Sequence, residues 1–246
     1  MIEEEAELIR VATRSKQAWY QNKFMWLFIF LLGVLLYYPF SVANDYRYFT
    51  YRALFCIVIL FTVYTLHLRR SLFLVALLLA GPSIVHHTFH IVNFRSPTSI
   101  INSVLSLTFD IFIVSVIFRR IFGKQHADSE SIFGALCIYL FVGFSFASIF
   151  MLVTELHPHA MYLDPAVSDH QTFNRLDAIY YSFGTMTSLG ATGITPVTGE
   201  ARLLTILEAL LGVLFLAVLV SRLLSAYGVK DPLSKTEESV TLRVKT

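Results

Sequence analysis

Six long apolar runs dominate this chain of 246 residues. Most are close to the roughly 20 residues that a helix needs to cross the hydrocarbon core of a bilayer. Hydrophobic residues make up 56% of the sequence and charged residues 15%, against about 25% charged residues in an ordinary soluble domain. The sequence therefore predicts an all-α integral membrane protein with six transmembrane helices. The predicted spans are Phe24–Val42, Ala53–Leu68, Ser71–Val92, Ser99–Phe118, Ile132–Leu156 and Ala201–Tyr227.

Basic residues are divided unevenly between the two sides that these spans define. With the amino terminus inside, fourteen of the nineteen lysines and arginines fall in cytoplasmic segments. Cytoplasmic loops of membrane proteins carry such an excess, so we expect a multi-pass protein of the cell (inner) membrane with both termini in the cytoplasm. The five basic residues left on the outer side are Arg47, Arg52, Arg95, Arg175 and Arg202.

The remaining composition argues against several classes of partner. A formal charge of +2 without a long basic run argues against nucleic acid, which leaves the lipid bilayer as the predicted surroundings. The only cysteines, Cys56 and Cys137, lie inside apolar runs and predict neither a disulfide framework nor a thiolate metal site. We expect no cofactor and no enzymatic activity.

Polar segments divide the chain into five parts. Residues 1–23 predict either an amphipathic helix on the cytoplasmic membrane surface or a partly ordered solvated tail. Residues 24–122 form a domain of four predicted spans, and a cytoplasmic link, 123–131, joins it to a module of two spans, 132–228. The cytoplasmic tail, 229–246, is too short to hold a ligand-binding domain.

The segment between the last two spans, Tyr180 to Pro196, reads YYSFGTMTSLGATGITP. Irregular backbone at membrane depth is tolerated only where protein buries it or where it lines a water-filled cavity. A break rich in glycine and threonine between two spanning helices is therefore a candidate ion pathway.

This segment resembles the potassium-channel signature, in which a pore helix leads into Thr-x-Gly-Tyr-Gly-Asp and then a proline. Tyr180 and Tyr181 correspond to the paired aromatics of the pore helix and Pro196 to the proline, while Arg202 corresponds to a basic residue that opens the inner helix. Gly212 lies where the family places a hinge glycine. The resemblance covers roughly residues 155–227. The corresponding filter positions are Thr187, Ser188, Leu189, Gly190, Ala191, Thr192 and Gly193.

The resemblance implies a homotetrameric channel with a re-entrant pore loop, which conducts monovalent cations passively and takes K⁺ as its expected ion. Residues 132–228 would then supply the outer helix, pore helix, filter and inner helix. A pore helix from about Arg175 to Thr187 would direct its partly negative carboxyl end toward a central cavity and so favour cations.

Departures from the signature predict weak discrimination between K⁺ and Na⁺. Gly190 keeps the first position that needs a positive φ, whereas Thr192 is expected to occupy the second, where a β-branched residue is disfavoured. Ala191 removes the tyrosine that braces the family's filter, so we expect a looser outer mouth. Alternatively, Gly193 shifts the loop and recovers the glycine-assisted carbonyls in another register.

The four spans before the link resemble the sensor domain of six-span voltage-gated channels in topology only. The fourth span carries no basic residue and one acid, Asp110, so we expect a voltage-insensitive protein. An intramembrane acid should face protein or a water-filled crevice, and Asp110 is interpreted either as a structural hydrogen-bonding group or as a proton or ion site. Glu208 is the intramembrane acid of the last span.

Histidines suggest a different class of protein. They fit interfacial packing, a proton or zinc regulatory site, or the metal centre of a membrane metalloenzyme, although the histidine-box pattern of desaturases is not matched. The six residues are His86, His87, His90, His157, His159 and His170. Three functions therefore stay open: a cation channel, a non-conducting regulatory or scaffold homologue of a channel, and a metalloenzyme.

Overall fold

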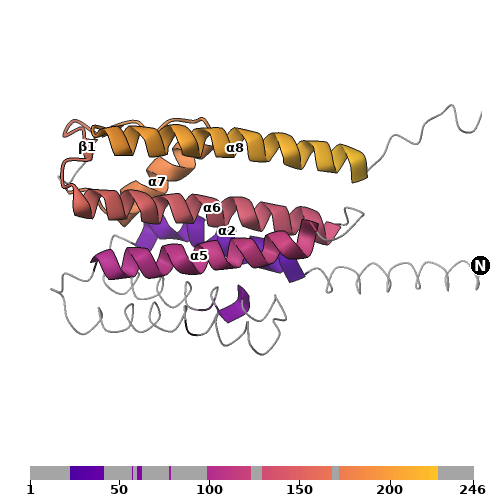
Figure 1. The fold of residues 1–246 in the computed structure, drawn as a ribbon. Helices are drawn as coiled ribbons and strands as arrows, with labels where there is room; N and C mark the ends of the chain where they lie inside the picture. The colour runs from indigo at the N-terminus through magenta and orange to yellow at the C-terminus, as the bar shows by residue number, and fades with distance from the viewer. Residues whose placement is uncertain are drawn as a thin grey trace, which may run out of the picture.

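The structure is a computed structural model that describes residues 23–41, 57, 60–62, 78, 99–122, 129–167 and 172–226. Its elements in chain order are α2 (Lys23–Ser41), α5 (Ser99–Phe122), α6 (Ser129–Leu156), β1 (Met161–Leu163), α7 (Arg175–Met186), β2 (Ile194–Pro196) and α8 (Gly199–Ala226). Helix α6 lies at the centre and contacts α2, α5, α7 and α8, while α7 slants across one end between α6 and α8 (Figure 1).

Four of the predicted spans coincide with helices α2, α5, α6 and α8. Helix α5 continues past the predicted end at Phe118 to Phe122, and α6 begins at Ser129 rather than Ile132. The second and third predicted spans lie largely outside the described residues. Within the described ranges, two helices are long and apolar enough to cross a membrane, Glu130–Leu156 and Gly199–Arg222.

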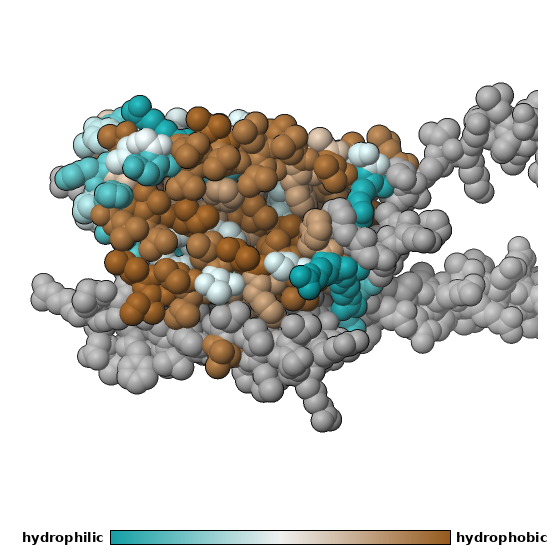
Figure 2. Space-filling view, in the orientation of Figure 1, coloured by the Kyte–Doolittle hydropathy of each residue, from teal (hydrophilic) through white to brown (hydrophobic). Residues whose placement is uncertain are grey.

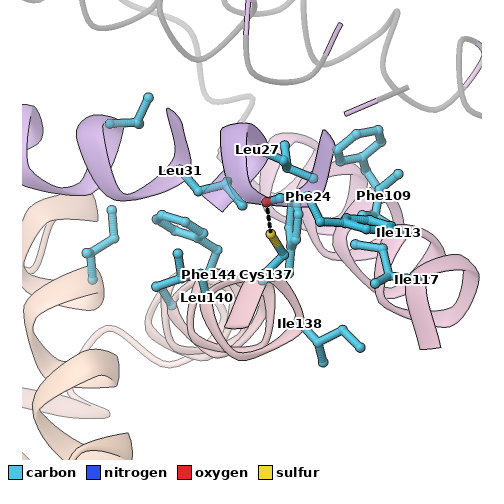
Figure 3. Close-up of a cluster of buried hydrophobic side chains, with 14 of the residues drawn as sticks. Phe24, Leu27, Leu31, Phe109, Ile113, Ile117, Cys137, Ile138, Leu140 and Phe144 are labelled. Carbon is cyan, nitrogen blue, oxygen red and sulfur yellow. Dashed lines mark hydrogen bonds between the residues drawn. The ribbon is translucent and has the colours of Figure 1, made fainter. Parts of the chain in front are cut away.

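The main core forms where α2, α5 and α6 meet (Figure 3). Apolar side chains spaced three or four residues apart fall on one face of each helix and pack against one another there. The side chains labelled in the figure are Phe24, Leu27 and Leu31 from α2, Phe109, Ile113 and Ile117 from α5, and Cys137, Ile138, Leu140 and Phe144 from α6. The Cys137 thiol donates a 3.5 Å hydrogen bond to the carbonyl of Phe24, which makes this cysteine a packing residue.

The same three helices are linked by charge at one end of the molecule. Arg120, near the end of α5, forms a 3.4 Å salt bridge with Glu130 at the start of α6. Its guanidinium also lies 5.3 Å from the ring centroid of Phe24 at the start of α2. Between this end and the polar loops at the other end, the visible face carries a continuous band of apolar side chains (Figure 2).

A second cluster of apolar residues joins the far end of α6 to the segment that follows it. Phe146 and Phe150 of α6 pack with Met161, Tyr181 and Ile194. These last three belong to β1, α7 and β2, so one cluster holds all the elements around the predicted pore segment together.

A short antiparallel sheet is present in addition to the predicted helices. Strands β1 and β2 pair with the register Met161↔Pro196, Tyr162↔Thr195 and Leu163↔Ile194. Strands of three residues are too short to show an alternating pattern, so the sequence offered no signal for them. Their pairing brings the two ends of the intervening segment together beside α8.

Candidate ion pathway

The predicted pore helix is present as α7, which begins at Arg175 and ends at Met186. Asn174 and Asp177 form a capping box, in which the Asn174 side chain accepts from the amide of Asp177 and the Asp177 side chain accepts from the amide of Asn174. This pattern satisfies backbone donors that the helix itself leaves free. Its sequence signature, Asn-x-x-Asp, was available to sequence analysis and was missed.

The carboxyl end of α7 lies between α6 and α8. The Tyr139 hydroxyl of α6 donates a 3.3 Å hydrogen bond to the carbonyl of Met186. On the other side, a β-carbon at Gly212 of α8 would lie 2.3 Å from the same carbonyl oxygen. At 1.5 Å per residue, Gly212 is about 20 Å along α8 from its start. Because β1 and β2 pair near the start of α8, α7 runs along α8 away from this sheet and the following loop returns to it.

The loop after α7 has three residues with positive φ. They are Ser188 at 59°, Gly190 at 81° and Gly193 at 83°. The expectation that Thr192 would take the second glycine position is therefore wrong, because Gly193 takes it one residue later. Glycine adopts this backbone without strain, whereas a β-branched side chain is strongly disfavoured there.

The carbonyls of this loop divide into two groups. The oxygen of Ala191 accepts from the amide of Ile194 at 3.3 Å, and that of Gly193 accepts from the amide of Asp164 at 2.8 Å. By contrast, the carbonyl of Thr192 and the four consecutive carbonyls from Thr187 to Gly190 accept no hydrogen bond from the described part of the chain. Backbone carbonyls are the ligands that replace water around a dehydrated cation, so the four consecutive ones are the candidates.

Gly184 of α7 holds the middle of the loop. The amide of Gly190 donates a 3.0 Å hydrogen bond to the carbonyl of Gly184. A β-carbon at Gly184 would lie 3.1 Å from the carbonyl oxygen of Gly190, so any side chain there would push the loop away by a few tenths of an ångström. The exposed turn between Gly184 and Gly190 therefore contains Thr187, Ser188 and Leu189.

Other side chains replace the brace expected from a filter tyrosine. The Tyr180 hydroxyl lies 3.0 Å from the Thr192 hydroxyl and accepts a 3.2 Å hydrogen bond from the amide of Thr192. Ala191 is partly buried against the cluster around Phe146. The Arg202 guanidinium donates a 3.1 Å hydrogen bond to the carbonyl of Pro196. The segment after α7 is thus held at three places within the chain.

Tyr181, the second aromatic of the predicted pair, faces the helices. Its hydroxyl lies 2.8 Å from the Thr205 hydroxyl of α8, and its ring meets that of Phe150 of α6 edge-on, with centroids 4.9 Å apart. The two tyrosines therefore have separate partners, since Tyr180 contacts the loop and Tyr181 joins α7 to α6 and α8.

The outer turn after β1 also contacts the loop, through residues that sequence analysis did not single out. The Asp164 side chain accepts a 2.9 Å hydrogen bond from the amide of Ala166 and so stabilises the turn. A β-carbon at Gly193 would lie 3.1 Å from the Val167 side chain. No local signal could identify this contact, since it joins residues 26 positions apart.

The two acids predicted to lie in the membrane, Asp110 and Glu208, have different surroundings. Asp110 of α5 is buried and interacts electrostatically with Arg175 at the start of α7, as does Glu155 at the end of α6. The hydroxyl of Ser103 donates a 3.5 Å hydrogen bond to Glu155. Glu208 of α8 has no exposed surface and contacts the Ser182 hydroxyl of α7. Both predicted acids thus face protein.

Two of the predicted histidines can be placed, His157 and His159, which are exposed in the turn after α6. His86, His87, His90 and His170 lie outside the described residues. Among the residues that the structure describes, no group of three or more histidine, cysteine or acidic side chains could hold a metal ion.

Comparison with known proteins bears on the same region. Residues 136–228 match the family model described as an ion channel. The match begins within α6 and ends just beyond α8, so the ion-channel region includes α7 and the loop with the unpaired carbonyls. This region is therefore similar to ion channels, and it contains most of both helices that are long and apolar enough to cross a membrane. Neither a curated protein nor a solved structure gives a significant match.

Proposed function

We propose that this protein is a homotetrameric channel of the cell membrane that conducts monovalent cations passively, with K⁺ as its expected ion. The observation that supports this most directly is the run of four unpaired carbonyls, from Thr187 to Gly190, at the end of a re-entrant helix within the ion-channel region. Four copies around an axis would turn each carbonyl into a ring of four oxygens.

Weak selectivity between K⁺ and Na⁺ is part of the proposal. Although Gly193 has the positive φ that the signature's second glycine would have, its carbonyl accepts from the Asp164 amide and the carbonyl of Ala191 from the Ile194 amide. The outer half of the loop thus offers fewer oxygens than the signature implies. A thousandfold preference corresponds to about 4 kcal/mol, which would have to come from the remaining rings.

Voltage insensitivity completes the proposal. Helix α5 occupies the position of the fourth span, and its arginines, Arg119 and Arg120, are confined to its last turn. Arg120 is already paired with Glu130. No ladder of basic residues crosses this helix, so the field has little charge to move.

The decisive experiment is flux through the purified protein in liposomes. We expect K⁺, Na⁺ and Cs⁺ flux well above that of empty liposomes, together with a cross-linked tetramer and no stoichiometric iron or zinc. A correctly assembled tetramer without flux would overturn the channel function and favour the scaffold homologue. Stoichiometric metal would favour the enzyme.

The matched control is Tyr162→Phe, which alters an exposed side chain of β1 outside the loop. It should leave flux and selectivity as in the wild type. A loss in this variant would show that the assay responds to general damage of the outer segment rather than to the pathway.

A further inference from the structure

Glu208 is a fully buried acid at the junction of three helices of the ion-channel region. It belongs to α8, its carboxyl oxygen Oε1 contacts the hydroxyl of Ser182 in α7, and its exposed surface is 0%. The second oxygen, Oε2, is buried and has no hydrogen-bond partner. A buried ionised carboxylate is costly unless charge and hydrogen bonds compensate it.

The Ser182 hydroxyl has a second contact. Its oxygen lies 2.7 Å from the carbonyl oxygen of Gly143 in α6. A serine hydroxyl carries one proton, whereas a carbonyl and an ionised carboxylate carry none. One proton cannot make both hydrogen bonds, so the pair of contacts needs a second proton.

We propose that Glu208 is a proton-binding site, and that the neutral acid donates to Ser182, which in turn donates to the carbonyl of Gly143. The chain of hydrogen bonds then runs from α8 through α7 to α6, and every contact has a donor and an acceptor. In this arrangement Oε2 is the carbonyl oxygen of a neutral acid, which is less costly to leave without a partner than an ionised oxygen.

The groups that face Glu208 do not favour an ionised form. Tyr139 from α6 and Tyr181 from α7 interact with it electrostatically. Each phenol already has a hydrogen-bond partner, since Tyr139 donates to Met186 and Tyr181 bonds to Thr205. No basic side chain among the described residues contributes to the surroundings of Glu208.

The position of this site gives it a consequence for the pathway, which rests on the proposed channel function. Ser182 precedes Thr187, the first of the four unpaired carbonyls, by little more than one helical turn. If Glu208 lost its proton, the Ser182 hydroxyl would donate to the carboxylate, and the carbonyl of Gly143 would lose its partner. The attachment of α7 to α6 would weaken at this point.

The first test does not depend on conduction. The infrared spectrum of the purified wild type at neutral pH should contain the carbonyl stretch of a protonated carboxylic acid, and the spectrum of Glu208→Gln should lack it. Because Asp110 and Glu155 are unchanged in the variant, the difference between the two spectra isolates Glu208. A difference spectrum without this band would overturn the proposal.

The second test compares substitutions by flux and thermal unfolding. Glu208→Gln keeps an amide that can donate to Ser182, so it should retain most of the wild-type flux and stability. Glu208→Ala and Ser182→Ala each break the chain and should lower flux roughly tenfold, the equivalent of about 1.4 kcal/mol. If the glutamine variant were as impaired as the alanine variant, the neutral donor would be excluded.

The two tests separate the two proposals. An infrared band in a protein without flux would leave the proton site in place and overturn the channel function. Flux without the infrared band would overturn the proton site and leave the channel function in place.

Discussion

Gly212 of α8 and Met186 of α7 approach so closely that a β-carbon on Gly212 would lie 2.3 Å from the Met186 carbonyl oxygen and 2.7 Å from its Cγ. Helix α8 runs without a break from Gly199 to Ala226 through this contact. The contact gives Gly212 a packing role at the end of the predicted pore helix, beside the hinge role that the family resemblance implies.

Gly212→Ala should therefore destabilise the protein, because the added methyl group meets the backbone carbonyl of Met186 as well as its side chain, and backbone cannot rotate aside. Overpacking of this kind typically costs about 1–3 kcal/mol, which thermal unfolding would detect, and flux should fall as the end of α7 is displaced. Gly33→Ala is the control, since nothing lies within 4 Å of a β-carbon there. Altered opening with unchanged stability would instead support the hinge.

Gly193→Ala should disturb the outer mouth. The residue has a φ of 83°, and the left-handed conformation costs a non-glycine residue about 1–2 kcal/mol. Crowding by Val167 adds to this strain. We expect lower stability and a changed K⁺/Na⁺ reversal potential, while Gly199→Ala, which has open space around its β-carbon, should behave like the wild type.

Restoring the residues of the potassium-channel signature should not by itself restore selectivity. The triple change Ala191→Tyr, Thr192→Gly and Gly193→Asp puts an aspartate where the backbone has a positive φ and places a large ring in the partly buried site of Ala191. We therefore expect poor assembly, measured by size-exclusion chromatography. A well-assembled variant with a larger K⁺ preference would show that the loop can adopt the signature's register.

The two adjacent tyrosines should have separable effects. Tyr180→Phe removes the hydroxyl that contacts Thr192 twice, so bi-ionic reversal potentials should shift while the helices stay packed. Tyr181→Phe removes the bond to Thr205 and should mainly lower the thermal stability, by about 0.5–1.5 kcal/mol for one hydrogen bond. Equal effects on selectivity in both variants would contradict this division.

Opening should depend little on membrane voltage. Each charge that crosses the field contributes about 2.3 kcal/mol per 100 mV, and α5 has basic residues only in its last turn. Planar-bilayer recordings should give a nearly constant open probability between strongly negative and positive potentials. A steep relation, with an apparent gating charge of several units, would refute the proposal.

The sequence by itself determined the helices. Apolar runs of nearly spanning length predicted α2, α5, α6 and α8, because a bilayer requires that length and that composition. The resemblance to the potassium-channel signature predicted α7, and the capping box of Asn174 and Asp177 that sets its start is likewise a local feature of the sequence.

Only the tertiary structure decided how the segment between the last two long helices is held. The pairing of Leu163 with Ile194, the bond from Asp164 to Gly193 and the chain from Glu208 to Gly143 all join residues that are distant in the sequence. Gly193 rather than Thr192 has the positive φ because the outer turn and β2 hold the backbone in that register. Such contacts depend on which elements pack against one another, and this packing cannot be read from the local pattern of residue types.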